Sequence, residues 1–124
     1  MEKNLLCHVK IETEDVTESF DTTALETAST LSFESPKGET HSLTELSDGW
    51  RYQKWGDAYL DFTFSDDITE GLYRIAGQTI IFEVQTLKSI NQKDFKYITY
   101  QLIESSKPLS IHTISITLDR VQEA

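Results

Sequence analysis

Three histidines are the first residues to consider for chemistry, because an imidazole can act as acid, base or metal ligand near neutral pH. They are His8, His41 and His112, and none stands at metal-ligand spacing from another or beside a suggestive carboxylate. Alternation along the chain predicts His8 and His41 on the outer, solvated faces of strands. His112 shares a predicted face with Ile114 and Ile116, which indicates the edge of a core. We expect no catalytic centre built on histidine.

The chain has one cysteine, Cys7, so an internal disulfide and a multi-cysteine metal site are excluded. Cys7 alternates with Leu5 and Val9, which predicts a small buried hydrophobic side chain rather than an exposed nucleophile. The sequence also lacks the phosphate-binding, dinucleotide, serine-hydrolase and zinc motifs. We therefore predict a protein that is not an enzyme and that holds no cofactor and no metal.

A group of carboxylates lies within residues 57–70, and clustered oxygen ligands suit hard cations such as Ca²⁺. Its members are Asp57, Asp61, Asp66, Asp67 and Glu70. Their spacing is not that of a calcium-binding loop, and two of them fall in a predicted turn, where Asp is favoured in any case. We expect these carboxylates to be solvated.

A group of aromatic residues lies within residues 50–64. It consists of Trp50, Tyr52, Trp55, Tyr59, Phe62 and Phe64. Such rings can fill the interior of a small barrel, line a ligand cavity or anchor a protein interface. Residue types alone leave these alternatives open.

The elements that must position these side chains have a period of two, typical of half-buried strands. Strands are predicted over 5–13, 29–34, 39–46, 50–55, 58–64, 69–75, 79–86, 95–103 and 111–118. Turn residues separate them, and a loop containing Pro108 precedes the last. The segment 17–28 repeats apolar residues every four positions, which makes it a candidate for a short helix, although its many Thr and Glu residues fit strand and loop equally well. The pattern predicts a single all-β domain over 1–124, an antiparallel barrel or sandwich of eight or nine strands.

The charge is strongly acidic, with 21 Asp and Glu against 11 Lys and Arg and a formal net charge of −10. Residues 1–48 hold eleven acids and three bases and so carry most of the excess. Such a field repels phosphate polymers and attracts basic partners. No apolar run reaches membrane-spanning length, and the first ten residues do not look like a secretory signal. We expect no direct nucleic-acid binding, no membrane insertion, a cytoplasmic location, and a monomer or homodimer.

The C-terminal half, over roughly residues 70–118, contains the segments Gly71–Ile75, Thr79–Thr86, Tyr97–Leu102 and His112–Thr117. These segments resemble the YwiB-like family of small bacterial proteins. The resemblance implies a lipocalin-like (calycin) β-barrel. It carries over no catalytic residue and no established ligand.

Two functional hypotheses follow. The first is an acidic protein that masks or inhibits a basic protein partner, as immunity proteins and inhibitors do. Its contact residues would be Glu12, Glu14, Asp15, Glu18, Asp21, Trp50, Trp55 and Tyr59. The second is a calycin-like carrier of a small apolar ligand, with a cavity lined by Phe62, Phe64, Phe82, Tyr97 and His112.

Overall fold

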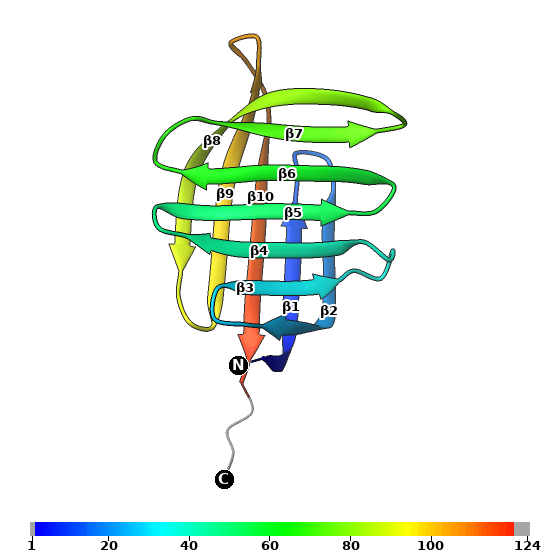
Figure 1. Ribbon diagram of the computed structural model, residues 1–124, viewed down its shortest axis with the longest axis vertical. Coiled ribbons are helices and arrows are strands. Elements are labelled where there is room, and N and C mark those ends of the chain that lie inside the picture. The colour runs from blue at the N-terminus through cyan, green and yellow to red at the C-terminus, as the bar shows by residue number, and fades with distance from the viewer. Residues whose placement is uncertain (1, 121–124) are drawn as a thin grey trace.

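The computed structural model describes residues 2–120, and these form ten strands (Figure 1). The strands are β1 (Lys3–Glu12), β2 (Thr17–Glu26), β3 (Thr30–Glu34), β4 (Thr40–Leu46), β5 (Gly49–Trp55), β6 (Ala58–Ser65), β7 (Thr69–Ile75), β8 (Gln78–Asn91), β9 (Phe95–Glu104) and β10 (Lys107–Asp119). The predicted all-β, single antiparallel barrel is confirmed.

The strands follow one another as antiparallel neighbours, and β1 pairs with β10 to close the barrel. In that pairing Cys7 lies opposite Leu118 and Val9 lies opposite Ile116. The closing strands thus bring apolar residues from the two ends of the chain into one interior.

Side-chain alternation supplies that interior, because inward positions are apolar on nearly every strand. In β9 the buried residues are Lys96, Ile98, Tyr100 and Leu102, with partly exposed residues between them. The largest of the fully buried side chains are Phe62, Phe64, Leu43, Ile98, Ile114, Ile116, His41, Val84 and Cys7.

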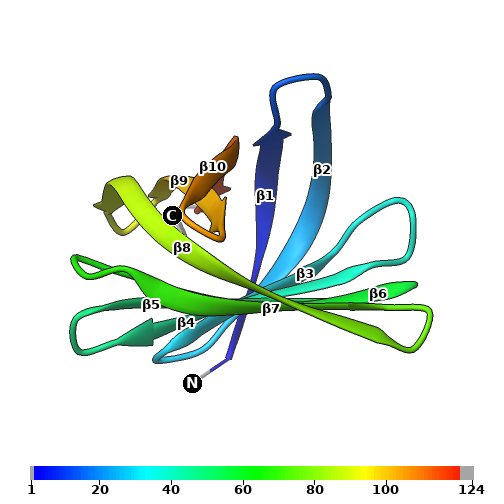
Figure 2. The same ribbon diagram turned by 90° about the horizontal axis from the view of Figure 1, so that it is seen from above.

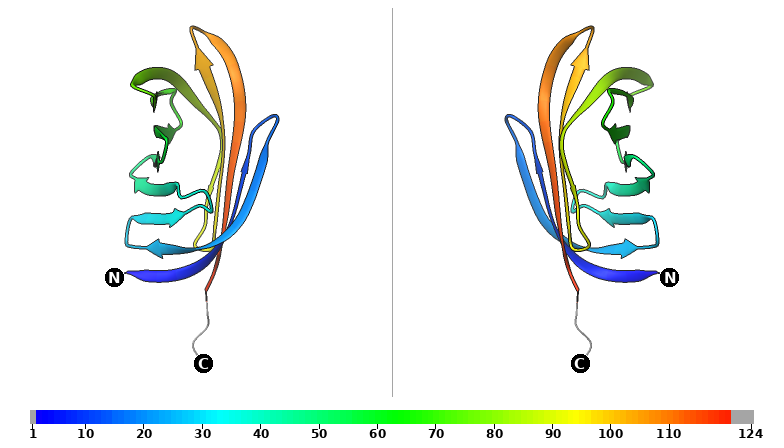
Figure 3. Two further views of the ribbon diagram at one scale, coloured as in Figure 1. Left: turned by 90° about the vertical axis from the view of Figure 1, so that its right-hand side faces the viewer. Right: turned by 90° about the vertical axis from the view of Figure 1, so that its left-hand side faces the viewer.

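The barrel is flattened into two walls whose strands cross (Figures 1 and 2). One wall contains β3 to β7, and the other contains β1, β9 and β10. Strands β2 and β8 pass from one wall to the other: β2 pairs with β1 along its length but with β3 only at Ala24–Glu26. Similarly, β8 pairs with β7 over 78–84 and with β9 over 83–91. Figure 3 shows the walls diverging toward the end where the β1–β2 and β9–β10 hairpins project.

Two glycines permit close approaches inside this wall. A Cβ on Gly71 would lie 2.4 Å from a ring carbon of Phe62, and a Cβ on Gly49 would lie 1.8 Å from the backbone oxygen of Phe64. Any larger residue would displace β7 from Phe62 or β5 from the end of β6.

Of the two alternatives for 17–28, the helix is wrong and the strand is observed, because Thr17–Glu26 forms strand β2. Apolar spacing of four is also a multiple of two, so Phe20 and Ala24 point inward on a strand as well. The many threonines favour a strand, and ten cross-strand partners on β1 fix it. This segment is the tenth strand.

The loop expected around Pro108 is also wrong. Ser105 and Ser106 form a tight turn with φ of 50° and 66°, so β10 begins at Lys107. A register shift between Pro108 and Ser110 accommodates the proline near the start of the strand.

Candidate ligand-binding cavity

A cavity of about 380 Å³ opens between the two walls, at the end marked by the β1–β2 and β9–β10 hairpins. We call this the open end. Residues that line it are Ile11, Thr13, Glu18, Glu39, His41, Tyr52, Lys54, Leu60, Phe62, Tyr73, Ile80, Phe82, Tyr100, Leu102, Leu109, Ser110, His112 and Ile114. The volume lies within the range of small-molecule sites in proteins.

The lining follows from strand alternation. Leu60 and Phe62 are inward residues of β6, and Ile80 and Phe82 are inward residues of β8. Because β2 leaves β3 before this end, the walls diverge beyond Phe62, whose ring still packs against Tyr100 of the facing wall. The result is a mostly apolar cavity with few polar groups, the usual composition of a ligand site.

A histidine–tyrosine pair is buried in one wall of the cavity. Nδ1 of His41 lies 2.7 Å from the Tyr52 hydroxyl, and both residues are almost fully buried. The His41 ring stacks on Phe33, with centroids 4.8 Å apart. Burial, aided by the charge of Lys54, lowers the pKa of His41 to about 4, and burial raises the pKa of Tyr52 well above its ordinary value. Both side chains are therefore uncharged at neutral pH.

A second polar pair lies on the facing strand β10. Oγ of Ser110 is 2.7 Å from Nε2 of His112, and the imidazole stacks on Tyr100 with centroids 5.1 Å apart. Burial lowers the pKa of His112 from its ordinary value, although the nearby Glu14 acts in the opposite direction. This imidazole is also neutral at pH 7.

The charged lining residues occur in ion pairs. Nζ of Lys54 lies 3.6 Å from Glu39, and Nζ of Lys37 lies 3.4 Å from Glu18. The Lys37–Glu18 pair connects the β3–β4 turn with β2, which is no longer paired with β3 at this end.

The opposite end of the barrel has a different chemistry, and we call it the charged end. Arg120 donates two hydrogen bonds of 2.9 Å to Glu26 and also bonds Asp94. Nζ of Lys96 donates to Oδ1 of Asn91 at 2.8 Å and to the carbonyl of Gln92 at 2.6 Å. The hollow at this end, about 290 Å³, is lined largely by such polar and charged residues.

The predicted cavity residues are partly brought together. Phe62, Phe82 and His112 line the cavity. Phe64 is buried, but its ring lies beyond Tyr100 and borders a separate hollow beside Gly49. The placement of Tyr97 in the cavity is wrong, because Tyr97 is on the outer face of β9 and has Lys88 over its ring.

Sequence reasoning missed Tyr100 and misplaced His41. Tyr100 alternates with Ile98 and Leu102, which was sufficient to place it inside. His41 was expected outside, yet it alternates with Leu43 and is buried with it. The expectation of a solvated His41 is wrong. His41 is on the same face of β4 as the apolar Leu43, and both side chains point into the core.

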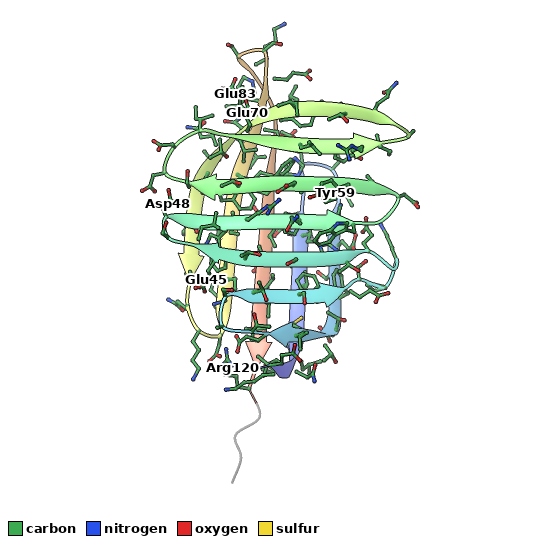
Figure 4. All side chains as sticks on the ribbon, in the orientation of Figure 1. Glu45, Asp48, Tyr59, Glu70, Glu83 and Arg120 are labelled. Carbon is green, nitrogen blue, oxygen red and sulfur yellow. The ribbon has the colours of Figure 1, made fainter. Side chains whose placement is uncertain are left out.

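The predicted partner-binding residues do not form one surface. Trp50 is buried and lies at the charged end, where its Nε1 donates to Ser89, so its placement as a surface anchor is wrong. Tyr59 lies on the outer face of β6 (Figure 4). It packs against Trp55 on the outer face of β5, with ring centroids 5.8 Å apart. Glu12, Glu14 and Asp15 lie where β1 ends and the chain turns into β2, Glu18 lines the cavity and Asp21 is on the outer face of β2.

His8 was expected to have no carboxylate beside it, and this is wrong. Its two ring nitrogens lie 2.5 Å from Asp21 and 2.9 Å from Asp119, on the strands either side of β1. These hydrogen bonds raise the pKa of His8. The residues face each other because β1 pairs with both β2 and β10, which the linear order does not reveal.

The remaining titratable candidates behave as structural groups. Cys7 is fully buried, as predicted, and burial raises its pKa to about 11. Asp61 accepts two hydrogen bonds from Arg51, which lower its pKa. Within residues 2–120, no group of three or more His, Cys, Asp and Glu side chains is arranged to hold a metal ion. Over the same residues, no helix has the length and hydrophobicity needed to cross a membrane.

The fold defines a class, the small closed antiparallel β-barrel. Among solved structures, the chain is similar to the crystal structure of the YwiB protein from Bacillus subtilis, with a TM-score of 0.62. The match covers 96% of this chain and 94% of that chain at 16% sequence identity. No protein-family model matches the chain, and the comparison with curated proteins finds no match. The chain thus has the fold of a YwiB-like barrel. The structural likeness extends over nearly the whole chain, beyond the C-terminal half in which the sequence resemblance lies.

Proposed function

We propose that this protein is a non-enzymatic barrel that binds a small apolar molecule in the cavity at the open end, as calycin carriers do. The observation that carries the proposal is the cavity itself, about 380 Å³ with a largely apolar lining. A barrel of this kind that served only as a packed scaffold would fill its interior with side chains.

The buried polar groups support binding rather than acid–base catalysis. The pKa of His41 is about 4, and the imidazole is hydrogen-bonded to a tyrosine whose own pKa is raised. General acid–base catalysis favours a pKa near the working pH, whereas both these groups are moved away from it. They suit a wall that orients a ligand.

The test uses N-phenyl-1-naphthylamine, an uncharged apolar probe that fluoresces when it leaves water. Saturable fluorescence enhancement is expected with the full chain. Ile80 lines the cavity and the next residue, Ile81, is exposed on the outer face, so Ile80→Trp and Ile81→Trp form a matched pair. I80W fills the cavity and should weaken probe binding about tenfold or more, whereas I81W should leave it unchanged. Equal effects of the two variants, or no saturable enhancement, would contradict the proposal.

Masking of a basic protein, the first hypothesis drawn from the sequence, is our second candidate and is supported by one specific feature. Trp55, 42% exposed, packs on Tyr59, and Tyr59 in turn is held by Gln53 and Asp61 through hydrogen bonds of 2.9 and 3.3 Å. An ordered, exposed aromatic pair is typical of an interface anchor.

Poly-lysine serves as the probe of this second candidate, measured by titration at low and high salt. Binding should weaken with salt and decrease further in Trp55→Ala. If binding weakens with salt but is unchanged in W55A, net charge alone accounts for the interaction. That result would contradict an interface anchored by Trp55.

A further inference from the structure

The charges around the cavity are arranged to disfavour an anion. Glu18, Glu39 and Lys54 are the charged residues among its lining, and Lys54 is already paired with Glu39. The acidic Glu14 lies close enough to act on His112. No unpaired cation is present among the described lining residues, so a carboxylate that entered would lose its hydration without a compensating charge.

Apart from the ion-paired Glu18, Glu39 and Lys54, the polar groups that face the cavity are neutral. On β10 the pair of Ser110 and His112 shares one hydrogen bond, and the tautomer of His112 decides its direction. In either tautomer the hydroxyl and the imidazole together retain a single donor and more than one acceptor. A hydroxyl group, which both donates and accepts, complements that set; a carboxylate offers acceptors alone.

A cation is also disfavoured, because the two carboxylates that line the cavity are already paired, Glu18 with Lys37 and Glu39 with Lys54. Protonation of His112 would place a positive charge in the cavity wall beside Glu14, yet burial outweighs that attraction and lowers the pKa of the imidazole. His41 in the other wall is held neutral in the same way. An ammonium group beside these imidazoles would meet the same unfavourable desolvation.

We propose, on the basis of the function proposed above, that the cavity selects an uncharged apolar molecule with a hydroxyl group, which bonds the Ser110–His112 pair, and discriminates against carboxylates and amines of the same chain length. The apolar wall from Leu60, Phe62 and Phe82 would take the hydrocarbon part. The ligand class is thus a fatty alcohol or a similar neutral alcohol, not a fatty acid.

The experiment compares three molecules that share a ten-carbon chain: decanol, decanoate and decylamine. Each displaces bound N-phenyl-1-naphthylamine from the full chain at pH 7.5, where the acid and the amine are ionised. Decanol is expected to displace the probe at a concentration about tenfold or more below the other two. Decanoate or decylamine acting as well as decanol would overturn the inference while the proposed function survived. Failure of the probe itself to bind would overturn both.

A matched pair of variants tests the hydroxyl contact. Ser110→Ala removes the proposed partner, and Ser115→Ala removes the same group from the outer face of the same strand. S110A should weaken displacement by decanol about threefold to tenfold, the usual effect of one neutral hydrogen bond, once the affinity of the variant for the probe has been measured and allowed for. S115A should change neither. Equal decanol displacement by S110A and the unsubstituted chain would contradict the assignment of the hydroxyl site.

Discussion

The same strands build both ends of this barrel, but the residues at the two ends differ in chemistry. At the charged end, Arg120 is bonded to Glu26 and Asp94, and Lys96 is bonded to Asn91 and the Gln92 carbonyl. At the open end, the buried polar residues are neutral imidazoles and hydroxyls around an apolar cavity. The charged groups of the first end satisfy each other across elements far apart in the chain.

The difference shows what a small barrel needs at each end. A network of charged hydrogen bonds stabilises structure only when its members are all paired, and at the charged end it connects β2, the β8–β9 turn and the end of β10. A cavity that takes ligand must instead leave apolar surface uncovered and keep a few polar groups that can still hydrogen-bond a ligand. The predictions below test that division.

The largest effect is expected from Phe62→Ala, at the base of the open end. Phe62 is 1% exposed, packs edge-on against Tyr100 with centroids 5.7 Å apart, and fills the space left by Gly71. Its loss should lower the free energy of unfolding by about 3–5 kcal/mol, measured by urea denaturation. Phe95→Ala, at a partly exposed residue of β9, is the control and should cost much less. Similar losses in both variants would mean that Phe62 does not belong to the core beneath the cavity.

The next effect is the pH dependence of the free energy of unfolding. It arises from His41 and His8, whose pKa values shift in opposite directions on folding. Folding lowers the pKa of His41 from 6.5 to about 4, so the unfolded chain binds more protons between these values. The contribution of the neutral His41 to the free energy of unfolding is complete above pH 6.5. About 2–3 kcal/mol of this free energy is lost as the pH falls toward 4. Folding raises the pKa of His8, so its contribution is complete below pH 6.5 and is lost as the pH rises through the folded-state pKa.

Urea denaturation of His41→Gln and His8→Gln across pH 4 to 8 checks both signs. Relative to the unsubstituted chain, H41Q should lose less stability as the pH falls, and H8Q should lose less as the pH rises. Curves that stay parallel to that of the unsubstituted chain would show that neither histidine is held as the structure describes.

A smaller effect is expected from Arg120→Ala at the charged end. The Arg120 side chain is 19% exposed, and its hydrogen bonds to Glu26 lower the pKa of that carboxyl. Removal should cost about 1–2 kcal/mol of unfolding free energy and leave probe binding at the open end unchanged. Arg51→Ala is the matched control, because Arg51 makes a similar pair with Asp61 but is 46% exposed, and it should cost about 0.5 kcal/mol. A change in probe affinity with R120A would show that the two ends are coupled.

The smallest effect comes from the outer wall, at neither end. Glu70 and Glu83 are both exposed and lie directly opposite each other in the β7–β8 pair (Figure 4). Like charges at such positions repel, so Glu83→Lys should raise the free energy of unfolding by about 0.5 kcal/mol at low salt. Glu34→Lys, at an exposed glutamate on the outer face of β3, controls for the change in net charge. An equal gain in E34K would assign the effect to net charge.

Most of the local structure could be predicted from the order of residues along the chain. Alternation in segments such as 58–64 and 95–103 predicted the strands, and Gly, Asp and Asn predicted most of the turns between them. This information is local, because side chains two apart on a strand share a face whatever the strand pairs with. The same rule placed Cys7, Phe62 and Val84 inside and, applied to Leu43, would have placed His41 inside as well.

Which strands pair and where the walls separate depend on tertiary contacts, and these could not be predicted from the sequence. The β1–β10 closure sets His8 between Asp21 and Asp119, and the short β2–β3 pairing leaves space for the cavity. Both depend on contacts between residues more than a hundred positions apart or on where a strand stops pairing, and neither leaves a periodic signal in the chain. Segment 17–28 illustrates the limit, because its spacing of four fits a helix and a strand equally and its ten partners on β1 determine that it is a strand.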